Sequence, residues 1–130
     1  MKAREQKQIL YRLEYIDDFL FELHHFSKHI STKEDFLKDR STQIIVSKQI
    51  QDIGEAIRII CKKIRPEIII EYPKIEWLEI VELRNRIAHE SFQIKIDTIY
   101  KALVMDIRIL EEELPKFKNY VLSQKKGNGS

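Results

Sequence analysis

Apolar residues recur every three or four positions along most of the chain, which is the spacing of amphipathic helices. The first such stretch covers residues 4 to 30, with apolar positions at Ile9, Leu13, Ile16, Leu20 and Leu23. A second runs from about residue 40 to 64, with the stripe Val46, Ile50, Ile53, Ile57, Ile60 and Ile64. These β-branched side chains lower helix propensity, but their period is 3.6 residues rather than 2, so the pattern predicts a helix.

Shorter signals mark the ends of these two helices. Ser31 and Glu34 have the spacing of a capping box, which predicts a short helix around residues 35–37. Asp39 is placed to cap the long helix that follows. Pro66 and Pro73 punctuate the next connection, which has room for one helical turn.

The last third of the chain predicts two more helices. One covers about residues 75–89 and the other residues 98–118, with Leu103, Leu110, Leu114 and Phe117 on one side. Between them, we interpret "QIKID" (93–97) as a linker with Asp97 as the next cap. The fold class is therefore all-α, a bundle of four to five helices in one domain over residues 1–118. Residues 119–130 are expected to form a polar, disordered tail.

Glycine is scarce, and Gly54 is the only one before the tail. This excludes glycine-rich phosphate loops and dinucleotide fingerprints. Inside a predicted helix, Gly54 is expected to let a neighbouring backbone approach closely.

Composition narrows the function only slightly. The 130 residues carry a net charge of +2, too little by itself to indicate binding to nucleic acid or membranes. The single cysteine, Cys61, excludes an internal disulfide and a cysteine-based zinc site, and we expect a packed, inert thiol. No apolar run reaches the roughly 18 residues needed to span a bilayer, so we expect no membrane association and a cytoplasmic location.

One charged residue interrupts the apolar face of the predicted helix 75–89. Since a helix turns about 100° per residue, Arg84 falls within the stripe made by Trp77, Ile80, Val81, Ile87 and Ala88. Burying an unpaired guanidinium costs several kcal/mol. Three explanations are open: an ion pair with Asp17, Asp18 or Glu55, a helix face that meets a second subunit, or a cleft that binds an anion.

His89 follows Arg84 by five positions, so the two side chains point about 140° apart on a regular helix. They could act on one atom if the helix ended near Ala88, or if two copies of the chain completed each other's site. A surface histidine without a catalytic role is the alternative.

Three segments in order resemble one known family. "LRNRIAHESF" resembles the R-x-x-x-x-H motif of the HEPN superfamily, in particular the HepT-like toxins. "FLKDRSTQIIVSKQIQDIGEAI" resembles the long helix of that family, and "YPKIEWLEIVELRNRIAHE" resembles its approach to the motif.

The resemblance implies an all-α homodimer in which the motif helices face a shared cleft. It implies a metal-independent endoribonuclease toxin with RNA as substrate, no cofactor, and Arg84 and His89 as the catalytic pair. The implied antitoxin partner is a minimal nucleotidyltransferase. Arg40 and Gln43 are candidate site-lining residues from the resemblance alone, with a solvated helix start as the alternative.

The chemistry is consistent with this implication. His24, His25, His29 and His89 are scattered and predict no convincing metal site, although His25 and His29 would share a helix face. A nuclease without a metal can use the 2′-hydroxyl of RNA as nucleophile, which leaves a 2′,3′-cyclic phosphate and spares DNA. Imidazole titrates near neutral pH and can transfer the proton, and a guanidinium can stabilise the phosphorane. Asn85, close to His89 on the helix surface, could orient either group.

One position departs from the family pattern. HepT-like motifs usually continue as H-x-Y, and the antitoxin attaches AMP to that tyrosine, whereas this chain has Ser91 there. Ser91 could accept the group instead, the antitoxin could act by binding alone, or the position could have been engineered. A second function class also stays open, in which the chain is a non-catalytic subunit that binds a nucleotidyltransferase.

Overall fold

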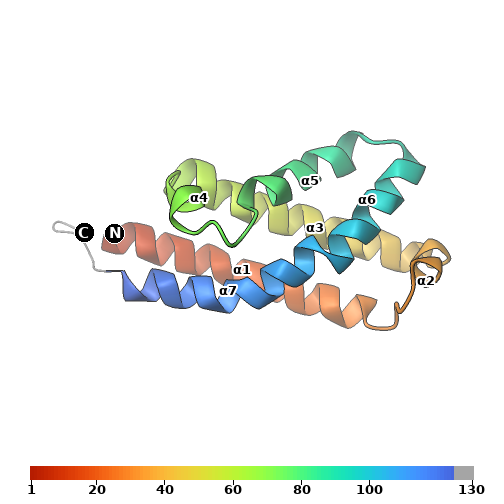
Figure 1. Cartoon of the computed structure of the whole chain (residues 1–130), viewed down its shortest axis with the longest axis horizontal. Helices are drawn as coiled ribbons and strands as arrows, with labels where there is room; N and C mark the ends of the chain where they lie inside the picture. The colour runs from red at the N-terminus through yellow and green to blue at the C-terminus, as the bar shows by residue number, and fades with distance from the viewer. Residues whose placement is uncertain (125–130) are drawn as a thin grey trace.

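A computed structural model describes residues 1–124, except for the side chains of residues 92–94. Every regular element in this part of the chain is helical, which confirms the all-α class (Figure 1). The elements are α1 (Ala3–Ser27), α2 (Lys33–Leu37), α3 (Arg40–Ile59), a π-helical turn (Ile60–Ile64), α4 (Ile68–Glu71), α5 (Trp77–His89), α6 (Phe92–Val104) and α7 (Asp106–Ser123).

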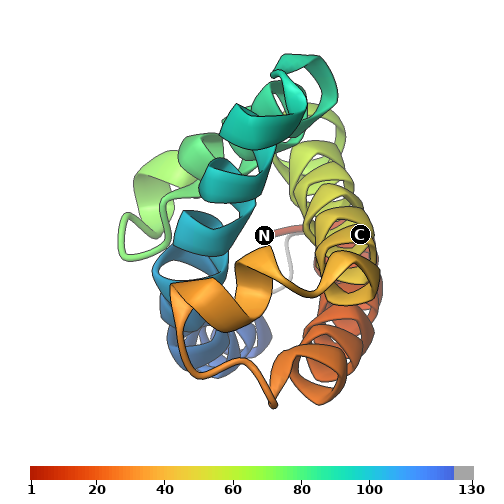
Figure 2. The same cartoon turned by 90° about the vertical axis from the view of Figure 1, so that its right-hand side faces the viewer.

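The two long helices at the start of the chain form the framework. α1 and α3 lie side by side in opposite directions, with α7 along α1 and the pair α5–α6 over α3 (Figures 1 and 2). The apolar stripe of α1 is buried as predicted, and so is that of α3 as far as Ile60. The buried core therefore lies between the apolar faces that the sequence predicts for these helices, and the helices form a single bundle.

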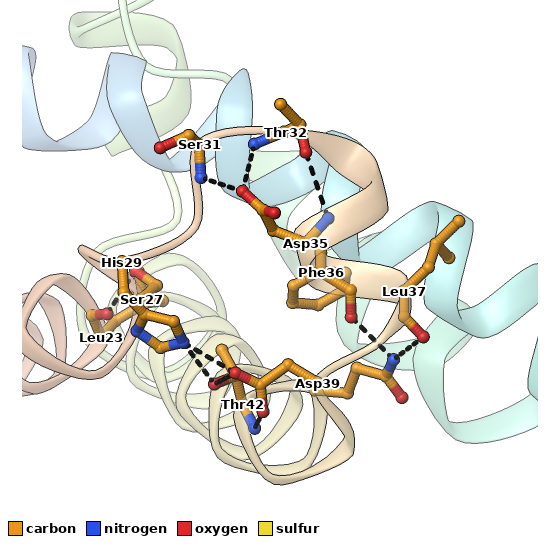
Figure 3. Close-up of polar contacts among 11 residues, drawn as sticks. Leu23, Ser27, His29, Ser31, Thr32, Asp35, Phe36, Leu37, Asp39 and Thr42 are labelled. Carbon is orange, nitrogen blue, oxygen red and sulfur yellow. Dashed lines mark hydrogen bonds and ion pairs between the residues drawn. The ribbon is translucent and has the colours of Figure 1, made fainter.

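The caps around α2 and α3 fix the turn that joins the framework helices (Figure 3). Asp39 caps α3 as predicted, since its Oδ1 accepts from the Thr42 amide at 3.0 Å. The predicted Ser31–Glu34 capping box is wrong by one residue. Thr32 is the N-cap, and its side chain and that of Asp35 accept from each other's backbone amides. Both registers satisfy the sequence pattern, and Asp35 also accepts from the Ser31 amide.

The end of α3 widens into the π-helical turn, and α4 supplies the predicted single turn between the two prolines. Cys61 lies in the π-helical turn and is buried, as expected. Burial raises the pKa of its thiol to about 11, so the thiol is unreactive at neutral pH.

In the last third of the chain the predicted helix over residues 75–89 is confirmed as α5, but the part after it differs from the prediction. "QIKID" is part of α6 rather than a linker, and Asp97 caps nothing but pairs with Lys33 and Lys101. The buried positions Ile96, Ile99 and Ala102 already have helical spacing, so the amphipathic pattern begins before residue 98. The helix then breaks at Met105, which divides the predicted 98–118 helix into α6 and α7.

The helical domain also extends beyond residue 118. α7 continues to Ser123, and Val121 is buried against the bundle, where its carbonyl accepts from the Gln6 side chain at 2.8 Å. Of the predicted tail, residues 125–130 lie outside the described part. Within the described residues, none of the helices is both long and apolar enough to cross a bilayer.

Candidate active site

Arg84 lies on the side of α5 that packs against α3, and Gly54 makes this packing possible. A Cβ placed on Gly54 would lie 3.1 Å from the Arg84 Cβ and 3.2 Å from the Ile80 carbonyl oxygen. The prediction that Gly54 admits a close neighbour is therefore confirmed. The Arg84 stem crosses the glycine, with Cδ 3.8 Å from the same point.

The guanidinium of Arg84 pairs with Glu55, one of the three acids considered from the sequence. Arg84 Nε lies 3.3 Å from Glu55 Oε2, and 40% of the arginine side chain is exposed. Arg84 falls within the angular range of the buried residues Trp77, Ile80, Val81, Leu83 and Ile87. It avoids burial because its apolar stem covers Gly54 while its charged head reaches solvent. Ala88, predicted on the same stripe, is exposed.

Glu55 is shared between two arginines. Arg58 donates to both of its carboxylate oxygens, at 3.0 and 2.8 Å, and Arg84 approaches from α5. The hydrogen bonds from Arg58, together with the charges of Arg84 and Arg58, lower the pKa of Glu55. Glu55 is therefore ionised at neutral pH and holds Arg84 by charge. The pattern "IGEAI" contained this residue, but its spacing alone did not distinguish it from Asp17 or Asp18.

His89 and Asn85 lie on the outer side of α5 and are exposed. α5 remains helical through His89 and ends at Glu90, whose amide donates to the Arg86 carbonyl at 2.9 Å. Because the helix does not end before His89, the divergence of about 140° from Arg84 holds. Within one chain the two side chains therefore point to different sides of α5.

The residues after His89 form the corner between α5 and α6. Ser91 is exposed and is the N-cap of α6, but its hydroxyl makes no capping bond. Thr98 donates to Glu90 Oε2 at 3.2 Å, whereas Glu90 Oε1 is buried without a hydrogen-bond partner. Sequence reasoning did not single out Glu90, since an acid beside a motif histidine is common on helix surfaces.

Arg40 and Gln43 lie one turn apart at the start of α3, and the structure does not bring them together with Arg84. Gln43 is buried, and its amide nitrogen donates to the carbonyls of Phe36 and Leu37 at 2.8 and 3.2 Å. The Gln43 side chain therefore caps the C-terminal end of α2. Arg40 is exposed, and both residues line a groove between α3 and α6.

The other histidines have separate surroundings. α1 ends at Ser27, before His29. The prediction that His25 and His29 share a helix face is therefore wrong. His29 lies in the following loop, where its Nε2 is 2.7 Å from Asp39 Oδ2 and 3.3 Å from the Thr42 hydroxyl (Figure 3). In residues 1–124 no cluster of three or more histidine, cysteine or acidic side chains has a geometry that could hold a metal ion.

Comparisons with known proteins single out one family. The model of the family described as "Ribonuclease HepT-like" matches residues 13–117. "Putative RNase MJ1380" from Methanocaldococcus jannaschii is 31% identical over 122 residues, which cover 93% of this chain and 97% of that protein. "Probable ribonuclease HepT" from Thermococcus cleftensis is 31% identical over 85 residues, covering 65% of this chain and 74% of that protein. No solved structure matches the chain.

Proposed function

Because the chain belongs to the HepT-like ribonuclease family of the HEPN superfamily, we propose that it is a metal-independent endoribonuclease and the toxin of a toxin–antitoxin pair. The observation that supports this most directly is the position of the R-x-x-x-x-H motif. Arg84 and His89 lie on the helix that packs over Gly54 and Glu55, inside the segment that matches the family. The proposed location is the cytoplasm.

The proposed reaction uses the nucleophile that RNA carries. His89 removes the proton of a 2′-hydroxyl, the 2′-oxygen bonds to the adjacent phosphorus, and the bond from phosphorus to the 5′-oxygen breaks. The leaving oxygen takes a proton from a protonated imidazole, and the other product is a 2′,3′-cyclic phosphate. Arg84 stabilises the charge on the phosphorane oxygens, and Asn85 orients the imidazole or the phosphate.

A homodimer would bring these groups together. In one chain Arg84 and His89 point to different sides of α5, and His89, Asn85 and Leu78 are all exposed. A second copy that packs against the exposed side of α5 could place its own Arg84 opposite His89. The proposed site is thus a cleft to which both subunits contribute.

The proposed antitoxin is a minimal nucleotidyltransferase, and Ser91 is the position where it would act. The Ser91 hydroxyl is exposed and free of a capping bond, so it is accessible for modification. A serine offers an aliphatic hydroxyl where the family pattern has a phenol. Transfer of AMP to Ser91 is therefore tested separately from RNA cleavage.

The experiment that tests the proposed function compares wild type with Arg84→Ala, in vitro with EDTA and in growing cells. We expect the wild type to cut RNA in EDTA and to inhibit growth, and Arg84→Ala to do neither while keeping its oligomeric state. If the wild type cuts no RNA and its expression is harmless, the chain is the non-catalytic partner of a nucleotidyltransferase instead.

A further inference from the structure

A groove of about 390 Å³ separates the first part of α3 from the first part of α6. In Figure 2 these two helices stand opposite each other below the α5–α6 corner. α6 contributes Lys95, Ile96 and Ile99, and α3 contributes Arg40, Gln43, Ile44, Ser47, Lys48 and Gln51. The volume of the groove is at the lower end of the range for sites that bind small ligands.

The charge of this groove has one sign. Arg40, Lys48 and Lys95 line it, and none of the described lining residues is acidic. By contrast, a larger groove, of about 730 Å³ between α1 and α6–α7, is lined by both basic and acidic side chains, among them Glu111 and Glu112. Lys48 does pair with Asp52 at 3.5 Å, but the lysine is 76% exposed, so an anion can compete for it at little cost.

The floor of the groove is apolar and its walls are polar. Ile96 and Ile99 are buried, whereas Ile44 is 59% exposed and offers a bare apolar surface. Ser47 and Gln51 lie on the wall. The Gln51 amide nitrogen donates to the Ser47 carbonyl and hydroxyl at 3.2 Å, which leaves the Gln51 amide oxygen as an acceptor for a ligand. Apolar contact, hydrogen bonds and cations together match a nucleobase with its phosphates.

The groove leads to the candidate active site along both helices. On α3, Gln51 comes one turn, about 6 Å, before Glu55, which holds Arg84. On α6, Lys95 comes one turn after Ser91, and its amide donates to the Ser91 carbonyl at 2.8 Å. Another groove, whose charged lining residues Lys7, Arg12 and Lys63 are all basic, lies between α1 and the end of α3. It also approaches Glu55, since the charge of Lys63 helps to lower the pKa of that carboxyl, but none of the described residues that line it belongs to α6.

We propose that the α3–α6 groove is a subsite for one nucleotide of single-stranded RNA beside the scissile phosphate. The base lies against Ile44, and the flanking phosphates are bound by Arg40, Lys48 and Lys95. This inference rests on the proposed function, because it takes RNA as the substrate of Arg84 and His89. Single strands suit the groove, since their bases are free to leave the stack.

The test measures binding without cleavage. A fluorescently labelled 2′-O-methyl RNA oligonucleotide lacks the nucleophile, so its anisotropy reports affinity for the wild-type protein across a salt series. Lys95→Gln should weaken binding several-fold and reduce the slope of log K against log salt by about 0.7, the value for one phosphate contact on a single strand. Ile44→Ala should weaken binding with the slope unchanged.

Two matched variants serve as controls. Lys101→Gln removes the same charge from α6, on a residue paired with Asp97, and Ile109→Ala shortens another exposed isoleucine on α7. Both should bind like the wild type. The inference is wrong if Lys95→Gln and Lys101→Gln bind equally well, or if inorganic pyrophosphate displaces the oligonucleotide as well as AMP does, which indicates an anion site only. If the wild type binds the oligonucleotide as expected but cuts no RNA, the proposed function is wrong. The binding data still test whether the groove holds a nucleotide.

Discussion

Arg84 and Glu55 form an ion pair that joins α5 to α3, with 3.3 Å between Nε and Oε2. The cationic half of the motif is thus oriented by a different helix from the one that carries His89. Glu55 is in turn held by two hydrogen bonds from Arg58. Positioning of the guanidinium therefore depends on residues that lie outside the motif itself.

Replacing Glu55 should impair catalysis through this orientation. In Glu55→Gln the Arg84 head loses its charged partner and samples other rotamers, and misplacement of a catalytic group can lower the rate by up to about 100-fold. Both side chains are more than a third exposed, so stability should change by no more than about 1 kcal/mol. Steady-state cleavage of an RNA oligonucleotide should show a fall in kcat with KM little changed.

Arg58→Gln is the graded comparison, because it removes the two hydrogen bonds that hold Glu55 but leaves the charge pair with Arg84. Its kcat should fall less than that of Glu55→Gln. Equal losses in the two variants would indicate that the whole cluster is merely structural, and a purely KM effect in Glu55→Gln would contradict the positioning role.

Filling the space at Gly54 should destabilise the bundle. Valine would press on the Ile80 carbonyl oxygen and the Arg84 stem, where a Cβ already lies at 3.2 and 3.1 Å. Overpacking of this kind costs typically about 1–3 kcal/mol. Alanine should cost less, because its higher helix propensity returns up to about 1 kcal/mol. Urea unfolding of wild type, Gly54→Ala and Gly54→Val measures the series, and a valine variant as stable as the wild type would contradict the close packing.

Acid should weaken the turn between α1 and α3. Hydrogen bonds from His29, then from the Thr42 amide and hydroxyl, lower the pKa of Asp39 to about 2. A carboxyl whose pKa is lowered by folding stabilises the fold above its unfolded pKa of about 3.9, and this contribution is lost as pH falls toward about 2.

Thermal unfolding between about pH 5 and pH 2 measures this contribution. Asp39→Asn keeps a side chain that can cap α3 but no longer titrates, so its Tm should fall less steeply with pH than that of the wild type. Asp52→Asn, on the surface of the same helix, should follow the wild type. Parallel curves for all three proteins would contradict the assignment to Asp39.

The sequence predicts the elements whose amphipathic period is long and whose caps are unambiguous. α1 and α3 each repeat the pattern over several turns, and Asp39 immediately precedes the second one. The predicted capping box of α2 is displaced by one residue, because Ser31 and Thr32 are both suitable N-caps with an acid three positions later. It fails at Asp97, because an acid before a helical stretch looks like a cap whether or not the chain is already helical.

The candidate site could be predicted only in part. Arg84 and His89 stand out in the sequence because a charge interrupts an apolar face five positions before a histidine. What holds Arg84 could not be chosen, since Asp17 and Asp18 lie on α1 and Glu55 on α3. The sequence pattern does not show that α5 packs against α3 rather than α1. The α3–α6 groove could not be predicted, because the sequence pattern places Lys95 in a linker, whereas in the structure it lies on α6.

Mixing two inactive variants should restore activity if the cleft is shared. Arg84→Ala and His89→Ala each remove one group, but a mixed dimer retains one intact Arg84 and one intact His89 on opposite subunits. We expect measurable RNA cleavage after the two proteins are unfolded together and refolded, and none from either alone. A mixture as inactive as its components would indicate that each site is built within one chain.

The central claim, that this chain cuts RNA through His89 and the 2′-hydroxyl, is tested most directly by RNA cleavage with EDTA present, comparing wild type, His89→Ala and His25→Ala. His25 is an exposed histidine on α1 and serves as the control. The account predicts fragments ending in a 2′,3′-cyclic phosphate from wild type and His25→Ala, and none from His89→Ala. Cleavage by His89→Ala at the wild-type rate would contradict it.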